Sequence, residues 1–211
     1  MTGARLAFDP EEALRALRRD PDLARLLRRC GPFTLEARPP ATPFRALLRA
    51  IVGQQLNGRA AEAIHGRVAA LYGGRPSPAR LLETPDAVLR GAGLSAAKLA
   101  ALRDLAQKTL AGRVPGWAAL RAMEDEAIIA RLTEVRGIGR WTVEMLLIFS
   151  LGRGDVWPVD DFAVRKAYSL HFGVVDPKPR ELLARAESWR PWRSVVAWYL
   201  WRSLEAPGAD L

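Results

Sequence analysis

The chain of 211 residues is 49% hydrophobic and 26% charged, which is enough apolar sequence for one core or two closely packed lobes. Its formal net charge is +9 and its pI about 10.7, so we expect a polyanionic partner, with nucleic acid ahead of an anionic membrane surface. A single cysteine and two histidines without ligand spacing exclude a disulfide framework and a cysteine-based zinc or iron–sulfur site within the chain.

Helix signals dominate the sequence, and no stretch alternates apolar and polar residues over the length of a strand. Asp9-Pro10 pairs an N-cap residue with a proline suited to the first helical position, and Thr42-Pro43 repeats this signal. Between them, residues 33–40 are expected to form an extended connector. The pattern predicts an all-α protein of about ten short helices in two lobes. The later helices are expected over residues 60–72, from 84 onward, and over 95–111, 124–135, 140–151, 160–172, 179–189 and 191–204.

The helix expected over residues 140–151 is apolar nearly all round, so it should lie in the centre of the fold. The stretch VRGIGRW, residues 135–141, precedes it. Gly137 and Gly139 allow positive φ and let backbone amides approach a ligand closely. These amides and that of Thr142 lie near a helix start and suit a phosphate, to which Arg140 adds charge. The alternative is an ordinary helix–helix turn with a glycine C-cap.

Further motifs follow the hairpin in a fixed order. GIGRWT is succeeded by WPVDD at residues 157–161 and by WRPWRSVVAWYLW at 189–201, while AIVGQQLNGRAAEAIHGRVAALYG occupies 50–73. Over about residues 43–204, the chain resembles the helix–hairpin–helix/Gly-Pro-Asp superfamily of DNA glycosylases, and within it the AlkA-type 3-methyladenine DNA glycosylases. The resemblance implies a helix–hairpin–helix glycosylase fold with two helical lobes and the active-site cleft between them.

The resemblance also implies a division of the chain. Residues 1–42 are expected to be N-terminal helices and a connector that pack on the core, and residues 43–211 form the glycosylase core. Within the core, one lobe with the DNA-intercalating loop covers about 43–122, and the hairpin and catalytic aspartate cover about 123–173. The C-terminal helices close the fold. Some family members carry an extra N-terminal β-rich domain; the segment before the core is too short for it, so we expect a compact form.

Two adjacent aspartates are the candidates for catalysis. Glycosylases hydrolyse the bond between a base and deoxyribose through a transition state that resembles an oxocarbenium ion. A carboxylate beside C1′ can stabilise this charge or orient the attacking water. The family pattern makes the second aspartate of the pair catalytic, which selects Asp161, while related branches would align Asp160 instead. One of the two is expected to cap the following helix, where the helix N-terminus favours an ionised carboxylate.

The residue two positions after the second hairpin glycine separates two chemistries in the family. Bifunctional relatives carry a lysine there that attacks C1′ and then cleaves the strand, whereas this chain carries a tryptophan. We therefore expect a monofunctional glycosylase, without lyase activity, that leaves an abasic site. Alkylated purines such as 3-methyladenine and 7-methylguanine carry positive charge, which an aromatic face attracts. By resemblance, the base pocket is lined by Trp141, Trp201, Met145, Phe162 and Phe44.

A base inside a duplex must be flipped out before it is excised, and a protein side chain fills the gap. GQQLNGR, residues 53–59, matches the family's intercalating loop, with Gln55 at the wedge position and Leu56 beside it; the sequence leaves both open. In the family, hairpin carbonyls can hold a structural Na⁺ or K⁺ that bridges to DNA. The matching carbonyls are those of Thr133, Val135 and Ile138. No other cofactor and no catalytic metal is expected.

Together these features predict a base excision repair enzyme that removes alkylated bases from double-stranded DNA. Two alternatives remain open: a non-catalytic helix–hairpin–helix DNA-binding protein, and a glycosylase for deaminated or oxidised bases. The N-terminus lacks a signal-peptide h-region and no apolar run reaches membrane-spanning length. We therefore expect a cytoplasmic, nucleoid-associated protein without membrane contact, acting as a monomer with no obligate protein partner.

Overall fold

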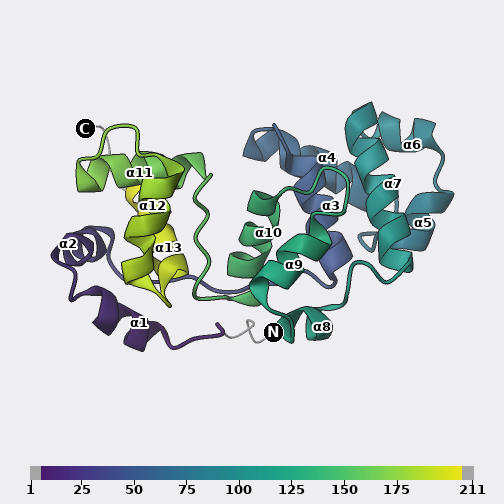
Figure 1. Ribbon diagram of the computed structural model, residues 1–211. Coiled ribbons are helices and arrows are strands. Elements are labelled where there is room, and N and C mark those ends of the chain that lie inside the picture. Colours follow the sequence, from purple (N-terminus) through teal and green to yellow (C-terminus); the bar gives the residue numbers. More distant parts are fainter. Residues whose placement is uncertain (1–5, 206–211) are drawn as a thin grey trace. The chain divides into compact units, whose positions relative to one another are not determined.

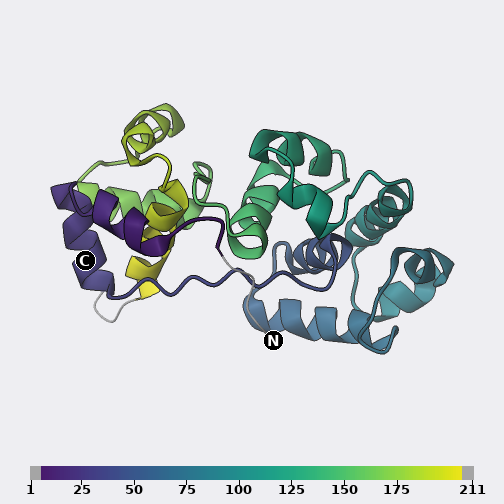
Figure 2. The same cartoon turned by 90° about the horizontal axis from the view of Figure 1, so that it is seen from below.

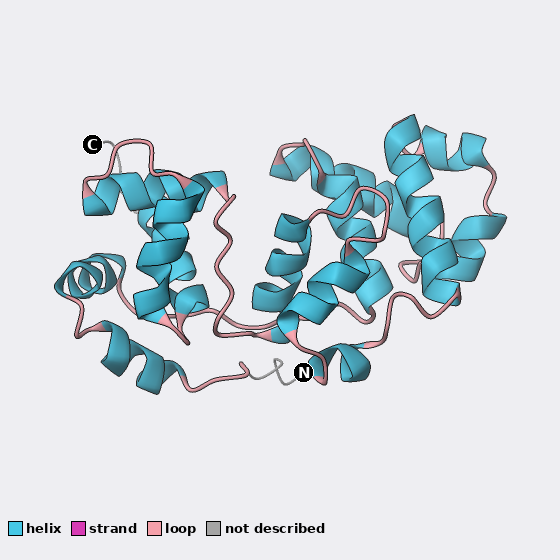
Figure 3. Ribbon diagram, viewed as in Figure 1, coloured by secondary structure: helices cyan, strands magenta, loops and turns pink. Residues whose placement is uncertain are grey.

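The computed structural model describes residues 6–205, and within this range the chain is helical with no β-strand, as the sequence predicts (Figures 1 and 3). No helix in the described range is both long and apolar enough to cross a membrane. The helices of the N-terminal two thirds are α1 (Pro10–Leu17), α2 (Pro21–Cys30), α3 (Pro43–Gly53), α4 (Gly58–Ala70), α5 (Pro78–Glu83), α6 (Asp86–Gly91), α7 (Ala96–Leu110), α8 (Trp117–Arg121) and α9 (Asp125–Leu132). They are followed by α10 (Arg140–Leu146), a π-helical turn η1 (Leu147–Leu151), α11 (Phe162–Phe172), α12 (Pro179–Ala186), the 3₁₀ turn η2 (Glu187–Trp189) and α13 (Arg193–Glu205).

N-cap residues and prolines explain where most of these helices begin. Asp9 and Thr42 cap α1 and α3, each followed by a proline at the first helical position, as predicted. Asn57 caps α4, which starts at Gly58 rather than at residue 60. Helices α2, α5 and α8 were not predicted. Asp20-Pro21 carries the same start signal as Asp9-Pro10, and α5 and α8 are too short for an apolar period to stand out.

The contacts divide the chain into two compact units. Unit 1 combines the chain up to Arg38 with the chain from Glu144 onward, and unit 2 is Pro39–Val143. The chain therefore passes from one unit to the other twice, once in the connector before α3 and once inside α10. The connector around residues 33–40 contains no helix, as expected.

Unit 1 is built from both ends of the sequence. Helix α2 packs on α13 and on α11, so that the purple N-terminal helices lie beside the yellow C-terminal one (Figures 1 and 2). The hydroxyl of Tyr199 on α13 donates a hydrogen bond of 3.1 Å to the carbonyl of Gly31, directly after α2. The buried core of this unit includes Leu14, Leu17, Leu23, Leu26, Trp157, Val164, Leu182, Trp189, Tyr199 and Leu200.

Unit 2 is organised around α7, which packs against α3, α5 and α6. Its buried side chains Leu102 and Leu105 have no exposed surface. Facing residues of the neighbouring helices, including Leu47, Leu48, Ile51, Leu81 and Leu89, are also buried. Burial of this apolar surface, at roughly 25 cal/mol per Å², holds the unit together and makes α7 its central element.

The apolar segment 140–151 is not one regular helix. It is α-helical to Leu146 and continues as the π-helical turn η1, which ends at Gly152 with φ of +69°. Most of this segment is buried, as expected, but not all of it. Leu147 and Ile148 are fully buried, but Trp141 is 46% exposed and Phe149 39% exposed. A π-turn carries one extra residue per turn, which changes the direction of the side chains that follow.

Asp20 is the polar residue that ties α2 to the C-terminal part of unit 1. Its carboxylate caps α2 by accepting from the amides of Asp22 and Leu23 and also accepts from the Trp189 indole and the Arg185 guanidinium. Burial raises the pKa of Asp20, but the hydrogen bonds from Arg185, Trp189 and the Leu23 amide outweigh it, so the pKa lies below its usual value.

We expect Asp20→Ala to lower the free energy of unfolding at pH 7 by about 2–3 kcal/mol, because a cap and charge-assisted hydrogen bonds are lost together. Asp9→Ala is the matched control. Asp9 caps α1 through one bond, from the Glu11 amide, so its loss should be nearer ~1 kcal/mol.

The lowered pKa of Asp20 also predicts that the stability difference between wild type and Asp20→Ala depends on pH. A carboxyl whose pKa is lowered by folding stabilises the native state above its ordinary value of 3.8 and ceases to do so as the pH falls through the lowered value. The difference in unfolding free energy between wild type and Asp20→Ala should therefore shrink below about pH 4. Urea titrations between pH 7 and pH 2.5 measure it, and a constant difference would contradict the role given to the charge.

Candidate active site

The carboxylate of Asp161 lies at the N-terminus of α11 and is 8% exposed. Its Oδ1 accepts a hydrogen bond of 2.8 Å from the Val164 amide, which makes Asp161 the N-cap of the helix. The same oxygen accepts a bond of 3.0 Å from the indole Nε1 of Trp201 on α13. The positive end of the α11 dipole and two N–H donors therefore converge on this carboxylate and stabilise negative charge there.

The loop before Asp161 is fastened to the start of α13, which fixes both sides of the Asp161–Trp201 contact. The buried hydroxyl of Ser194 accepts from the Val156 amide at 2.9 Å, and the Ser194 amide donates to the Gly154 carbonyl at 2.9 Å. The guanidinium of Arg193 donates to the carboxylate of Asp155 at 2.6 Å. The carboxylate and the indole are thus held by the backbone on each side rather than by their mutual bond alone.

An aromatic residue that was not predicted joins this group. The ring of Phe149, in the π-turn η1, lies 5.5 Å from that of Trp201 with an interplanar angle of 32°. π-Turns occur frequently at functional sites because they redirect side chains. Phe149 follows Trp141 and Met145 at intervals of four residues, a spacing that could have identified it from the sequence.

The other residues predicted for catalysis or for the base pocket lie in different surroundings. Asp160 is exposed and is not the residue that caps α11. Phe162 is 79% exposed, Met145 is half-buried, and Trp141 presents nearly half of its surface. Phe44 is 2% exposed in the core of unit 2, so in this structure it offers no accessible face to a base.

The hairpin between α9 and α10 covers residues 133–139. Gly137 has φ of +79°, a left-handed conformation that favours glycine, whereas a Cβ added there would make only an ordinary contact of 3.4 Å with the Cβ of Ala101. Gly139 does not have positive φ, contrary to expectation, and a Cβ there would meet nothing within 4 Å. Ile138, 4% exposed, anchors the loop in the core. Within the described residues, the amides of Gly137 and Gly139 donate to no acceptor.

The neighbouring residues of the hairpin are engaged in the fold. The Thr142 amide, expected to point to a ligand, instead donates to the Gly139 carbonyl at 3.0 Å and closes the first turn of α10. The guanidinium of Arg140 pairs with Glu126 on α9. The Val135 carbonyl accepts from the Ile138 amide at 3.0 Å. No cluster of three or more His, Cys, Asp or Glu side chains suited to a metal occurs among residues 6–205.

Two side chains of α7 support the hairpin from behind. The carboxylate of Asp104 accepts from the Arg136 amide at 2.7 Å and from the Lys108 ammonium at 2.8 Å. Lys108 also donates to the carbonyl of Glu134. Burial raises the pKa of Asp104, but the hydrogen bonds from Arg136 and Lys108 outweigh it and hold the pKa below its usual value.

The predicted wedge residues lie in the short loop between α3 and α4. Gln55 is exposed and has φ of +58°, a left-handed conformation that is uncommon for a residue other than glycine. Leu56 is 37% exposed. Gln54, which precedes both, donates a hydrogen bond of 2.6 Å from its side-chain amide to the carbonyl of Gly137 in the hairpin.

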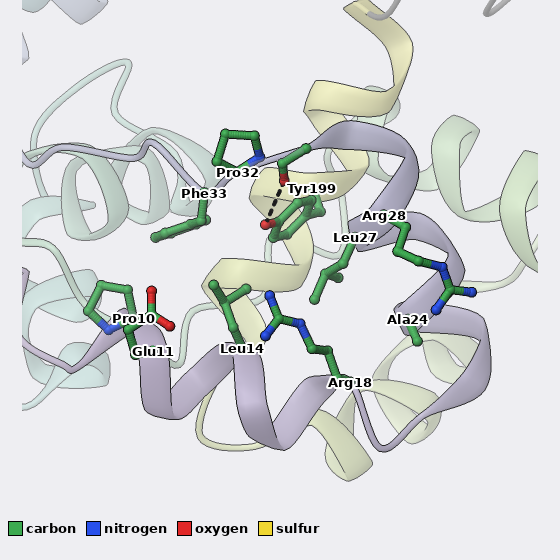
Figure 4. A pocket seen from close by; sticks show the side chains of 11 residues that line it. Pro10, Glu11, Leu14, Arg18, Ala24, Leu27, Arg28, Pro32, Phe33 and Tyr199 are labelled. Atoms are coloured by element: carbon green, nitrogen blue, oxygen red, sulfur yellow. Dashed lines mark hydrogen bonds between the residues drawn. The ribbon is translucent and has the colours of Figure 1, made fainter.

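A cavity of about 520 Å³ lies elsewhere in unit 1 (Figure 4). Its walls come from α1, the end of α2 and α13, with Arg18 and Arg28 among the lining residues. Tyr199, bonded to the Gly31 carbonyl, forms part of the wall (Figure 4). None of the residues predicted for the active site lines this cavity.

Known DNA repair proteins are similar to this chain in both sequence and fold. Residues 48–193 match the HhH-GPD superfamily of base excision DNA repair proteins. DNA-3-methyladenine glycosylase 1 of Schizosaccharomyces pombe is 40% identical over 164 residues, which cover 76% of this chain and 72% of that protein.

Solved structures agree with this assignment. The S. pombe 3-methyladenine DNA glycosylase in complex with abasic DNA is similar with a TM-score of 0.84 and 34% identity, covering 93% of this chain and 98% of that one. A DNA-3-methyladenine glycosidase from Bacillus halodurans is similar with a TM-score of 0.82 and 33% identity, covering 94% of this chain and 91% of that one. The chain therefore belongs to the HhH-GPD superfamily of base excision DNA repair proteins and, within it, to the AlkA-type 3-methyladenine DNA glycosylases.

Proposed function

We propose that this protein is a monofunctional DNA glycosylase that excises alkylated purines, such as 3-methyladenine and 7-methylguanine, from double-stranded DNA. The observation that carries the proposal is the carboxylate of Asp161, fixed at a helix N-terminus and bonded to the indole of Trp201. A protein that only bound DNA would need the hairpin, but it would not need a buried carboxylate oriented in this way.

The reaction replaces the bond between C1′ and the base nitrogen with a bond between C1′ and a water oxygen. As the C–N bond breaks, its electron pair leaves with the base, and positive charge develops on C1′ and the ring oxygen. The Asp161 carboxylate stabilises that charge electrostatically and orients the water, whose proton is released. An alkylated purine is already cationic and leaves as a neutral molecule, so no strong general acid is required.

Aromatic side chains supply the recognition of the base. Trp201 and Phe149 form a pair of rings beside the carboxylate, and an electron-rich ring face attracts a cationic purine by ~0.5–2 kcal/mol. By the family resemblance we also assign a role in base recognition to Trp141, which is exposed at the start of α10, and to Met145, four residues further along this helix.

The hairpin supplies the contact with the DNA backbone. The amides of Gly137 and Gly139 have no acceptor among the described residues, so they are available for phosphate oxygens. Among the described residues, the Thr133 carbonyl accepts no hydrogen bond, and the Val135 carbonyl accepts one, from the Ile138 amide. Each oxygen therefore has at least one lone pair with which it could coordinate a Na⁺ or K⁺. Such an ion would add positive charge facing a phosphate. The proposal includes action as a monomer.

Asp161→Asn is expected to lower base release from methylated duplex DNA by at least about 100-fold, because the charge that stabilises the transition state is removed. Asparagine is also a good N-cap and keeps an oxygen acceptor for Val164 and Trp201, so folding and DNA affinity should be retained. Single-turnover release of labelled base, alongside a binding titration, tests this. Release at the wild-type rate would remove Asp161 from the mechanism.

The product is expected to be an intact strand with an abasic site. The position where bifunctional relatives carry a nucleophilic lysine is Trp141, and the ammonium groups of Lys98 and Lys108 are bonded to main-chain carbonyls. Denaturing gels should show strand breaks only after alkali treatment, and borohydride should trap no covalent adduct. A trapped adduct would show that an amine attacks C1′.

Gly139→Ala is expected to weaken DNA binding by about tenfold or more without loss of stability. The fold has room for a Cβ at this position and φ is ordinary, so the methyl group obstructs only an approaching phosphate. Gly116→Ala, which also has open space around the Cβ, is the matched control. Equal affinities of the two variants at fixed salt would argue against a phosphate contact at Gly139.

A further inference from the structure

The side chain of Gln54 joins the two loops that the proposed function assigns to DNA. Its Nε2 donates a hydrogen bond of 2.6 Å to the Gly137 carbonyl, 83 positions along the chain. Gln54 itself lies directly after α3, at the base of the loop that presents Gln55 and Leu56. Because its amide reaches the hairpin, Gln54 is tied to the protein, and the two exposed residues after it are the ones presented to a ligand.

The Gln54 bond helps to fix the orientation of the Gly137 N–H in the hairpin. Asp104 accepts from the Arg136 amide, and Gln54 donates to the Gly137 carbonyl. These two groups belong to the peptide units on either side of the one that carries the Gly137 N–H. With both neighbouring peptide units fixed, the orientation of the Gly137 N–H is fixed as well. Gln54 is therefore one of two clamps on an amide that the proposed function directs toward a phosphate.

Helix α7 supports both loops at once. Besides Asp104 and Lys108 behind the hairpin, its Lys98 donates to the Val52 carbonyl, near the end of α3, at 2.7 Å. Burial lowers the pKa of Lys98. One helix, α7, thus contacts both the end of α3, where the wedge loop begins, and the hairpin. The Gln54 bond adds a direct link between the two loops.

The loop that follows Gln54 is also conformationally demanding. Gln55 is held at φ of +58°, which costs a residue other than glycine about 1 kcal/mol or more. A strained residue persists only where its surroundings determine the backbone. The Asn57 cap on the Ala60 amide fixes one end of the turn, and the Gln54 bond to the hairpin fixes the other.

From this arrangement we propose that Gln54 is a positioning residue that couples the phosphate-binding hairpin to the wedge loop. When the hairpin binds a phosphate, the Gln54 bond fixes the position of the loop that carries Gln55 and Leu56. Binding of the DNA backbone and displacement of the base are then coupled. This inference rests on the proposed function, since it needs both loops to meet DNA. It assigns no chemical step to Gln54.

Two variants test it. Gln54→Met keeps the length of the side chain and removes the donor, and Gln54→Glu keeps the shape but presents an acceptor to the Gly137 carbonyl. Gln107→Glu, on the exposed surface of α7, is the control for the added negative charge. The substrate is a duplex with 2-aminopurine at the target position, whose fluorescence rises when the base leaves the stack. Thermal unfolding and affinity for an undamaged duplex are measured beside it.

At saturating protein we expect the extruded fraction to fall by about threefold to tenfold in both Gln54 variants, the range that the loss of one hydrogen bond allows. Affinity for undamaged DNA should fall by less than the extruded fraction does, because the hairpin amides and the Asp104 clamp remain, and the unfolding temperature should stay close to wild type. Gln107→Glu should extrude the base as wild type does. A merely structural role would instead lower the unfolding temperature and all DNA properties together.

Wild-type extrusion by Gln54→Met, or a loss only in step with the unfolding temperature, would overturn the coupling. Failure of the proposed function has a different signature, because the wild-type protein would then neither extrude the base nor release methylated purines.

Discussion

The convergence of two N–H donors on one oxygen of Asp161 is the interaction on which the proposed chemistry of this protein depends. The Val164 amide belongs to the helix that the aspartate caps, and the Trp201 indole belongs to a helix that meets it from the other end of the sequence. Through this oxygen, Asp161 both caps α11 and links it to Trp201 on α13. A carboxylate with this many fixed partners loses little entropy when it meets a reacting sugar, which is what preorganised electrostatic stabilisation requires.

In unit 2, the loops that we propose to contact DNA also have backbone groups oriented by side chains from other elements. The hairpin has little regular structure of its own, and Asp104, Lys108 and Gln54 supply the constraints that a helix or strand would otherwise provide. Backbone amides make contacts that do not depend on base identity, which suits an enzyme that must search all sequences for a lesion. Selectivity is then left to the pocket and to the ease of base extrusion.

Sequence patterns predicted the fold class, most helix starts and a cap on α11 by one of two adjacent aspartates, because these depend on local signals such as Asp-Pro and Thr-Pro pairs. Residues whose roles depend on long-range packing were harder to predict. The spacing of Phe149 from Met145 marks it as a candidate, but the π-turn in which it lies has no local signal, and Phe44 is buried because its helix turns that face to the core. The bond from Gln54 to Gly137 spans 83 positions, a distance over which periodicity carries no information.

The π-turn at Leu147–Leu151 restricts the number of residues in this segment more than it restricts which hydrophobic residues occupy it. Such a turn holds a residue that an α-helix of the same span would not contain, as a single inserted codon would leave behind. Deleting that residue would restore a regular helix of similar span, but it would turn the side chains within the segment, Phe149 among them, to other directions. The packing after the turn is tight, since the Gly152 carbonyl accepts from the Ala7 amide and a Cβ added at Gly152 would lie 3.0 Å from the Cα of Leu6. Hydrophobic exchanges should therefore be tolerated here across evolution, whereas one-codon deletions should be rejected.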